Sequence, residues 1–542
     1  MAIVRICGLF TAHDPRSRAT QPILRFFNEI YTVERVTSGQ NKIDPRTPIL
    51  VGQAQVAQHE DHLANAAGPI ELMSQAVREA FADAHVRLEG TKNSLTIDAL
   101  RVVRSLSTRN TNPARDIAST LDINANEYGL TPHGGNMPQY LVNSAALQIR
   151  DHGAQMIVLT GGESFRSRRR ARAAQMTLPW MELKEGQEGQ EPTPLGDDLV
   201  MNHEIELAHN IMLPIEIYPM FETALRYRDK RTVAEHQKHI SELWSRFSGV
   251  AATNPHAWIQ QEYTAEAIRT PTQDNRMIGF PYTKLMNSNN DVDMAAALVM
   301  CSVERAEALG IARDKWIFLH AGTDCHEHNF VSHRYSFTDT PAIRIGGQRV
   351  LQLAQKSIDE IENIDLYSCF PSAVQLGAES LGVSLDRQLT CTGGLSFAGG
   401  PFNNYVMHAI ATTMTKLREN PQETGLVWAN GGYATKHAFG VYATTPPQHG
   451  FKHESPQREV DSLPRREVAT AIDAQGSATV EAYSVMHDRT GAPEKVRAAV
   501  LLADGRRAWA TSGDTQLGQD MCETEWVGKT ITLDATGDIK IG

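Results

Sequence analysis

Apolar residues recur along this chain at two spacings that alternate. Residues 49–51 form a short apolar run after two prolines, Pro45 and Pro48, which favours an extended strand. Residues 69–84 instead carry apolar side chains at helical spacing, and residues 98–106 are again strand-like. The pattern therefore predicts a strand–helix–strand unit that begins near residue 43.

A second unit of the same kind follows. Residues 140–152 have helical spacing, Gly153 suits the end of that helix, and residues 156–160 form a buried-type strand that ends at Gly161-Gly162. This alternation predicts a sheet covered by helices.

Residues 166–290 interrupt the alternation, so we interpret them as a long insertion, with a helix at residues 234–248. From residue 291 the pattern returns. It predicts helices at 294–309, 350–361 and 403–417, with strands at 316–321 and 364–367. Two similar α/β halves are thus expected to flank the insertion.

Short β-rich runs dominate the end of the chain, at residues 478–486, 496–502 and 530–533. We expect a small antiparallel β-barrel there. The predicted domains are an N-terminal extension (1–42), a first half (43–165), the insertion (166–290), a second half (291–450) and an additional C-terminal domain (455–542).

Composition narrows the function classes. The chain has 542 residues, 41% of them hydrophobic, and a formal net charge of −11, which argues against sequence-independent binding to nucleic acid. Its apolar runs are shorter than the roughly 20 residues that cross a bilayer, and its start does not resemble a signal peptide. We expect a cytoplasmic protein without membrane insertion, and its six scattered cysteines are expected to be reduced thiols.

Four segments, taken in order, resemble the motifs of one family. They are residues 140–149 with the turn Gly161-Gly162-Glu163, residues 364–370, residues 393–401, and residues 428–432. Their order and spacing resemble the thiolase superfamily, including the sterol-carrier-type thiolases. With the β-rich tail, the chain is most similar to thiolase-like protein type 1 with its additional C-terminal domain. The resemblance implies two α/β halves in a five-layered α-β-α-β-α fold with a loop-domain insertion.

The same resemblance implies an acyl-CoA acyltransferase, of the acetyl-CoA acetyltransferase kind, that uses coenzyme A thioesters as substrates and holds no permanent cofactor. Yet the nucleophilic cysteine of thiolases falls at or beside Asn136, where no cysteine is found. Gly400 stands in the place of the activating histidine, and Ala429 in the place of the last cysteine. An amide cannot form an acyl-enzyme thioester.

Other parts of the implied site survive. Backbone N–H groups at Asn136, Asn430, Gly431 and Gly432 can polarise a thioester oxygen. By the resemblance, Cys369 matches the acid/base cysteine of the sterol-carrier-type motif. Tyr367 replaces that motif's histidine in the same segment.

Each of these residues also has a structural interpretation. Cys369 can be a small core residue, Asn136 can occupy a left-handed tight turn, and Gly431 with Gly432 can form a structural turn. His437 can orient a base or the substrate, or lie on a surface helix, which the neighbouring Lys436 favours slightly.

Two further clusters of side chains are candidates for ligand binding. Arg166 and Arg168 suit the phosphates of coenzyme A, or a solvated helix face. Residues 324–328 with His333 carry metal-binding side chain types but lack a metal-binding spacing, so we predict a polar loop and no metal.

Three functions remain open at this stage. They are an acyltransferase with altered chemistry, a retro-aldol lyase acting on a CoA ester, which related proteins perform with tyrosines, and a non-catalytic acyl-CoA-binding protein. A homodimer is the default expectation for the assembly.

Overall fold

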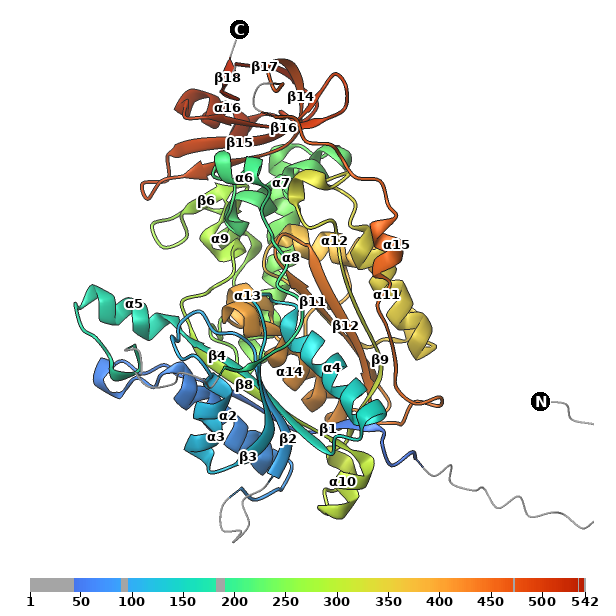
Figure 1. The fold of residues 1–542 in the computed structure, drawn as a ribbon. Coiled ribbons are helices and arrows are strands. Elements are labelled where there is room, and N and C mark those ends of the chain that lie inside the picture. Colours follow the sequence, from blue (N-terminus) through green and yellow to red (C-terminus); the bar gives the residue numbers. More distant parts are fainter. Residues whose placement is uncertain (1–42, 89–95, 182–190, 471–472, 535, 541–542) are drawn as a thin grey trace, which may run out of the picture. The chain divides into compact units, whose positions relative to one another are not determined.

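The computed structural model describes residues 43–88, 96–181, 191–470, 473–534 and 536–540 (Figure 1). The predicted extension, residues 1–42, lies outside the described residues. A compact unit begins at Asp44.

A mixed eleven-stranded sheet forms the centre of this unit. Its first half contains, in order, β5 (Thr193–Pro194), β3 (Asn124–Leu130), β2 (Thr96–Val102), β4 (Met156–Ser164), β8 (Asp293–Ser302) and β1 (Pro48–Ala57). Its second half contains β9 (Ile317–His326), β12 (Lys436–Ala443), β11 (Thr424–Gly431) and β10 (Asn363–Leu366), with β13 (Lys452–Glu454) beside β9. The halves join where β1 meets β9, through only two residue pairs.

Helices lie on both faces of each half. α4 (Met137–His152) and α14 (Tyr405–Glu419) contact strands of both halves and form a central layer. α2 (Pro69–Asp83) and α3 (Pro113–Leu121) cover the first half, while α11 (Pro341–Ala354) and α12 (Pro371–Leu381) cover the second. This α-β-α-β-α order agrees with the predicted fold class.

The predicted helix at 294–309 is wrong. Those residues form most of β8 and then the short helix α10 (Val303–Ala308). All ten residues of β8 are buried, and a strand covered on both faces carries an unbroken apolar run that periodicity alone does not separate from a buried helix. β8 pairs with β1 and β4 of the first half, although the predicted boundary at residue 291 assigned it to the second.

The insertion is mostly helical. It contains α5 (Phe165–Ala173), α6 (Glu204–Ala208), α7 (Pro214–Arg228), α8 (Val233–Thr253), α9 (Ala265–Arg269), β6 (Met277–Phe280) and β7 (Tyr282–Thr283). Two other short helices are α13 (Gly394–Phe397) and α15 (Gln457–Asp461). Among the described residues, no helix is both long and apolar enough to cross a membrane.

The C-terminal strands build a second sheet. Its order is β16 (Arg507–Ser512), β15 (Pro493–Leu502), β14 (Gly476–His487), β17 (Thr530–Leu533) and β18 (Ile539–Lys540). Strand β6 of the insertion also pairs with β14. Helix α16 (Thr515–Glu523) packs on β15 and β14. A single bridge between Thr511 and Asp538 links its two edges. The sheet is therefore curled, and continuous pairing around a barrel is not confirmed.

Helix α7 is held by this second sheet, which lies beside it in Figure 1. The Thr223 hydroxyl donates a 2.9 Å hydrogen bond to the backbone oxygen of Tyr483. Arg226 forms a 3.0 Å ion pair with Glu525, and Arg497 forms one of 2.9 Å with Glu216. The C-terminal segment thereby fixes a helix of the insertion.

Candidate functional site

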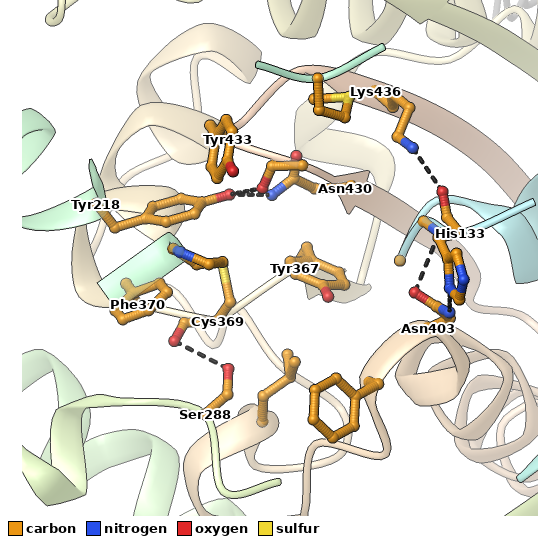
Figure 2. Close-up of a pocket in the computed structure, with 18 of the residues that line it drawn as sticks. His133, Tyr218, Ser288, Tyr367, Cys369, Phe370, Asn403, Asn430, Tyr433 and Lys436 are labelled. Carbon is orange, nitrogen blue, oxygen red and sulfur yellow. Dashed lines mark hydrogen bonds between the residues drawn. The ribbon is translucent and has the colours of Figure 1, made fainter. Parts of the chain in front are cut away.

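A cavity of about 490 Å³ lies between the start of α4, the end of β11 and helix α7 (Figure 2). Five predicted site residues line it, namely Tyr367, Cys369, Asn430, Gly431 and Gly432. The fold thus brings together segments that are far apart in the sequence.

Tyr367 lies in the loop between β10 and α12, and Asp365 anchors that loop. The buried Asp365 carboxylate accepts hydrogen bonds from the Cys391 backbone N–H at 2.8 Å and from the Tyr405 hydroxyl at 3.1 Å. Burial raises the pKa of Asp365 to about 6. The Tyr405 ring stands edge-on to the Tyr367 ring, with centroids 5.7 Å apart. These contacts hold the Tyr367 backbone and ring in one position.

The Tyr367 side chain faces the cavity. Its residue is 7% exposed, and no other described residue bonds to its hydroxyl. Burial raises the pKa of this phenol well above its ordinary value, since a phenolate is poorly solvated here. Tyr367 is therefore a neutral hydrogen-bond donor at physiological pH.

Cys369 lines the same cavity two residues later. Burial raises the pKa of its thiol to about 12, and the nearby Tyr218 hydroxyl lowers the pKa by a smaller amount. At neutral pH the thiol stays protonated, whereas a nucleophilic cysteine needs a lowered pKa. The raised pKa suits a proton donor better than a covalent nucleophile.

Tyr218, on α7, is a cavity residue that the sequence did not indicate. Its hydroxyl accepts 2.9 Å hydrogen bonds from Asn430 Nδ2 and from the Ala434 backbone N–H. It donates a 3.2 Å bond to the Gly432 oxygen. Its ring stacks on Phe370, with centroids 4.6 Å apart. The insertion thereby supports the turn that follows β11.

The end of β11 packs closely against the start of α4. A Cβ atom at Gly431 would lie 2.6 Å from Asn136 Oδ1 and 3.1 Å from the Gly135 nitrogen, so only glycine allows this approach. Gly432 has a φ of +69°, in the left-handed region. The N–H groups of Gly135 and Asn136 have no acceptor among the described residues, so they are free to bind a ligand oxygen.

Asn136 is the residue before the first turn of α4, with a φ of −76°. The left-handed turn considered for it is therefore wrong. Its side chain lines an adjacent cavity of about 720 Å³, and its Oδ1 atom is buried without a hydrogen-bond partner.

His437 lies in β12, buried, and the surface-helix alternative is wrong. Its strand pairs with β11 on one side and with β9 on the other. The charged neighbour Lys436 had favoured an exposed position, but Lys436 is itself buried. Trp428 Nε1 donates to His437 Nδ1 at 3.3 Å, and burial lowers the pKa of the imidazole well below its ordinary value. His437 lines the same adjacent cavity as Asn136, not the one that contains Tyr367.

The two predicted phosphate-binding arginines lie on α5 and bond within the protein. Arg166 donates to the Glu60 oxygen and pairs with Asp61 at 2.8 Å, while Arg168 donates to the Leu106 oxygen at 2.9 Å. Arg166 also lines a third cavity, of about 1140 Å³. This third cavity shares Asn287, Ser288 and Asn290 with the Tyr367 cavity, so the two are contiguous.

Residues 324–326, predicted as part of a polar loop, instead end strand β9. Asp324 accepts a 2.6 Å hydrogen bond from His453. Over the described ranges, no group of three histidine, cysteine or acidic side chains is placed to hold a metal ion.

Three more cavity residues were missed, and no motif marked them. They are His133, Asn403 and Lys436. Asn403 Oδ1 accepts from the Gly134 N–H at 3.0 Å, and Asn403 Nδ2 lies 3.2 Å from His133 Nδ1. Desolvation lowers the pKa of His133, so the ring is largely neutral and its Nδ1 atom accepts the hydrogen bond that Asn403 Nδ2 donates.

Comparisons with known proteins agree with this architecture. Residues 456–538 match the additional C-terminal domain of thiolase-like protein type 1. A monomeric SCP2-thiolase like protein type 1 from Mycobacterium smegmatis is 28% identical with a TM-score of 0.77, over 92% of this chain and 100% of that chain. No curated protein sequence matches.

Two more distant structures share the fold. The Ltp2-ChsH2(DUF35) aldolase is 18% identical with a TM-score of 0.54, over 74% of this chain and 98% of that chain. An acetyl-CoA acetyltransferase from Syntrophomonas wolfei is 16% identical with a TM-score of 0.51, over 74% of this chain and 100% of that chain.

Proposed function

We propose that this chain, which has the thiolase fold and resembles thiolase-like protein type 1, binds an acyl-CoA thioester and makes or breaks a carbon–carbon bond next to the thioester carbonyl. The reaction proceeds through a thioester enolate and not through an acyl-cysteine. One observation carries the proposal: the neutral phenol of Tyr367 and the neutral thiol of Cys369 face the same cavity as the free N–H group of Gly135.

The chemistry assigned to each group follows from its charge state. The N–H group of Gly135 stabilises the enolate oxygen at the N-terminus of α4. In acyl transfer, the small ionised fraction of Cys369 or Tyr367 takes the α-proton of one acyl-CoA. The resulting enolate carbon attacks the carbonyl of a second acyl-CoA and displaces CoA as a thiolate. In the reverse direction, Cys369 or Tyr367 donates a proton to the enolate carbon, for which a high pKa is suitable.

Aldol cleavage is the second candidate, favoured by the unbonded hydroxyl of Tyr367. Cleavage of a 3-hydroxyacyl-CoA yields a carbonyl product and a thioester enolate. The hydroxyl proton of the substrate then reaches the enolate carbon through the Tyr367 hydroxyl. The resemblance to an aldolase supports this candidate at the level of the fold.

The contiguous third cavity suits the long arm of coenzyme A. It shares Ser288 with the wall of the Tyr367 cavity. Arg276 and Lys284 also line it, and their charges suit phosphate groups, whereas Arg166 is already paired with Asp61.

Titration calorimetry with coenzyme A, acetyl-CoA and a longer acyl-CoA tests the binding, and the intact mass after incubation tests the absence of an acyl-cysteine. We expect micromolar binding with no mass increase of one acyl group. Cys369→Ala is compared with Cys391→Ala, a buried cysteine that lines none of the three cavities. A stable acyl adduct lost only in Cys369→Ala contradicts the enolate route. Binding without thiolysis or aldol cleavage leaves the protein as a non-catalytic acyl-CoA binder.

A further inference from the structure

Lys436, the first residue of β12, is an almost fully buried cation in the cavity wall, with 5% of its surface exposed. Its ammonium donates one hydrogen bond, of 2.6 Å, to the backbone oxygen of His133, as Figure 2 shows. No carboxylate within the described part of the chain forms an ion pair with it. Asp198, an exposed residue that lines the same cavity, raises the pKa of Lys436 but forms no ion pair with it.

The ammonium lies where α4 begins and β11 ends. A Cβ atom at Gly134 would be 3.0 Å from Lys436 Nζ, and one at Gly431 would be 3.2 Å from Lys436 Cε. Both glycines line the cavity. The positive charge is therefore next to the N–H groups of Gly135 and Asn136, which have no acceptor of their own.

A buried charge without a counter-ion is costly unless a ligand compensates it. Burial lowers the pKa of Lys436, because the charged ammonium is less well solvated here than in water. An ammonium has three donors, and His133 uses one of them, so two remain for a ligand. A neutral thioester does not offset this charge fully, whereas an enolate or alkoxide oxygen does.

We propose that Lys436 is a catalytic residue, whose ammonium stabilises the oxyanion of the thioester enolate together with the N–H groups at the start of α4. This inference rests on the proposed function and extends it, because it adds a fixed positive charge to the site. Cys369 and Tyr367 are predominantly neutral, so among these three side chains Lys436 is the one whose positive charge stabilises the negative charge that develops on the enolate oxygen.

The experiment follows deuterium incorporation at the α-carbon of saturating acetyl-CoA in deuterium oxide. Lys436→Gln keeps a donor for the His133 oxygen but removes the charge, and Lys436→Arg keeps the charge. Lys315→Met serves as the control, because Lys315 is paired with Asp83 at 3.0 Å and lines none of the three cavities. Calorimetry gives the Kd of acetyl-CoA for each variant.

We expect Lys436→Gln to slow exchange about 100-fold, the usual effect of removing one oxyanion donor, with a change in Kd below about threefold. Lys436→Arg should recover at least about a tenth of the wild-type rate, and Lys315→Met should exchange at the wild-type rate. Exchange within about threefold of wild type in Lys436→Gln overturns the inference but leaves the proposed function intact. Wild-type protein that binds acetyl-CoA without exchange refutes the enolate chemistry, and the inference with it.

Discussion

The hydroxyl of Tyr218 accepts a 2.9 Å hydrogen bond from the side chain amide of Asn430. The first residue lies on a helix of the insertion, and the second lies near the end of a central strand. One phenol thus connects the insertion to the turn that forms one wall of the cavity. Tyr218 is itself fixed from behind, because its helix is bonded to the C-terminal sheet.

Replacing Tyr218 with phenylalanine tests this connection. Tyr218→Phe leaves Asn430 Nδ2 and the Ala434 N–H buried without an acceptor, which costs about 1–3 kcal/mol. Denaturant unfolding measures the loss. Tyr227→Phe, an exposed tyrosine on the same helix, should change stability by less than about 0.5 kcal/mol. Equal stability of the two variants would show that the hydrogen bonds do not support the turn.

A side chain at Gly431 should damage the oxyanion site. Gly431→Ala places a methyl group 2.6 Å from Asn136 Oδ1 and 3.1 Å from the Gly135 nitrogen, so the Asn136 side chain must move and the Gly135 N–H must shift slightly. We expect the deuterium exchange rate to fall at least about tenfold, since the N–H groups of α4 move away from the ligand. Gly513→Ala is the control, because nothing lies within 4 Å of its added Cβ atom. Unchanged exchange in Gly431→Ala would place the reacting oxygen elsewhere.

The Cys369 thiol should resist alkylation in the native protein. With its pKa raised to about 12, about one thiol in 10,000 is ionised at pH 8, and the thiolate is the reactive form. The rate of carboxamidomethylation by iodoacetamide, followed by peptide mass spectrometry, should rise about tenfold per pH unit up to the limit of protein stability. In denaturant, where an ordinary pKa near 8.5 applies, alkylation should be fast. Rapid native alkylation at pH 7 would reveal an activated thiolate and favour covalent catalysis.

The pairing of Arg226 with Glu525 should be essential to the C-terminal contact. Arg226 is 1% exposed and also donates to the Tyr483 hydroxyl at 2.7 Å. Arg226→Met removes the cation from Glu525, which keeps its backbone donors Trp526 and Val527, and removes one of the hydrogen bonds of the Tyr483 hydroxyl. We expect this to cost about 1.5–3 kcal/mol in thermal or denaturant unfolding, the usual range for hydrogen bonds to a charged group. Arg506→Met removes the surface partner of Asp504 and Asp473 and should change stability far less than Arg226→Met does. Similar losses in both variants would show that the buried pair is not a main contact.

Much of the fold could be predicted because its helices carry clear periodicity and several of its strands are short apolar runs bounded by turn residues. The predicted helix at 69–84 corresponds to α2, and the predicted glycine C-cap at Gly153 has a φ of +75°. β8 could not be identified, since its small apolar residues are buried on both faces. The contact of β6 with β14 pairs residues some 200 positions apart, and local sequence carries no sign of it.

The candidate site was predictable only where a motif existed. The segment around Tyr367 and Cys369 and the glycines after β11 were found by resemblance, and the structure brings them together. Tyr218 and Lys436 belong to no motif, and their importance comes from tertiary burial beside a cavity. Arg166 and Arg168 suggested phosphate binding, but the structure gives both of them partners within the chain.

Deuterium exchange at the α-carbon of acetyl-CoA, with wild-type protein and the double variant Tyr367→Phe with Cys369→Ala, tests the central claim most directly. The account predicts that the wild type catalyses exchange, and that the exchange rate rises with pH as the small ionised fraction of Cys369 or Tyr367 grows. In the double variant the exchange rate should fall at least about 100-fold. Exchange that is equal in both proteins, or absent in a wild type that binds acetyl-CoA, would contradict it.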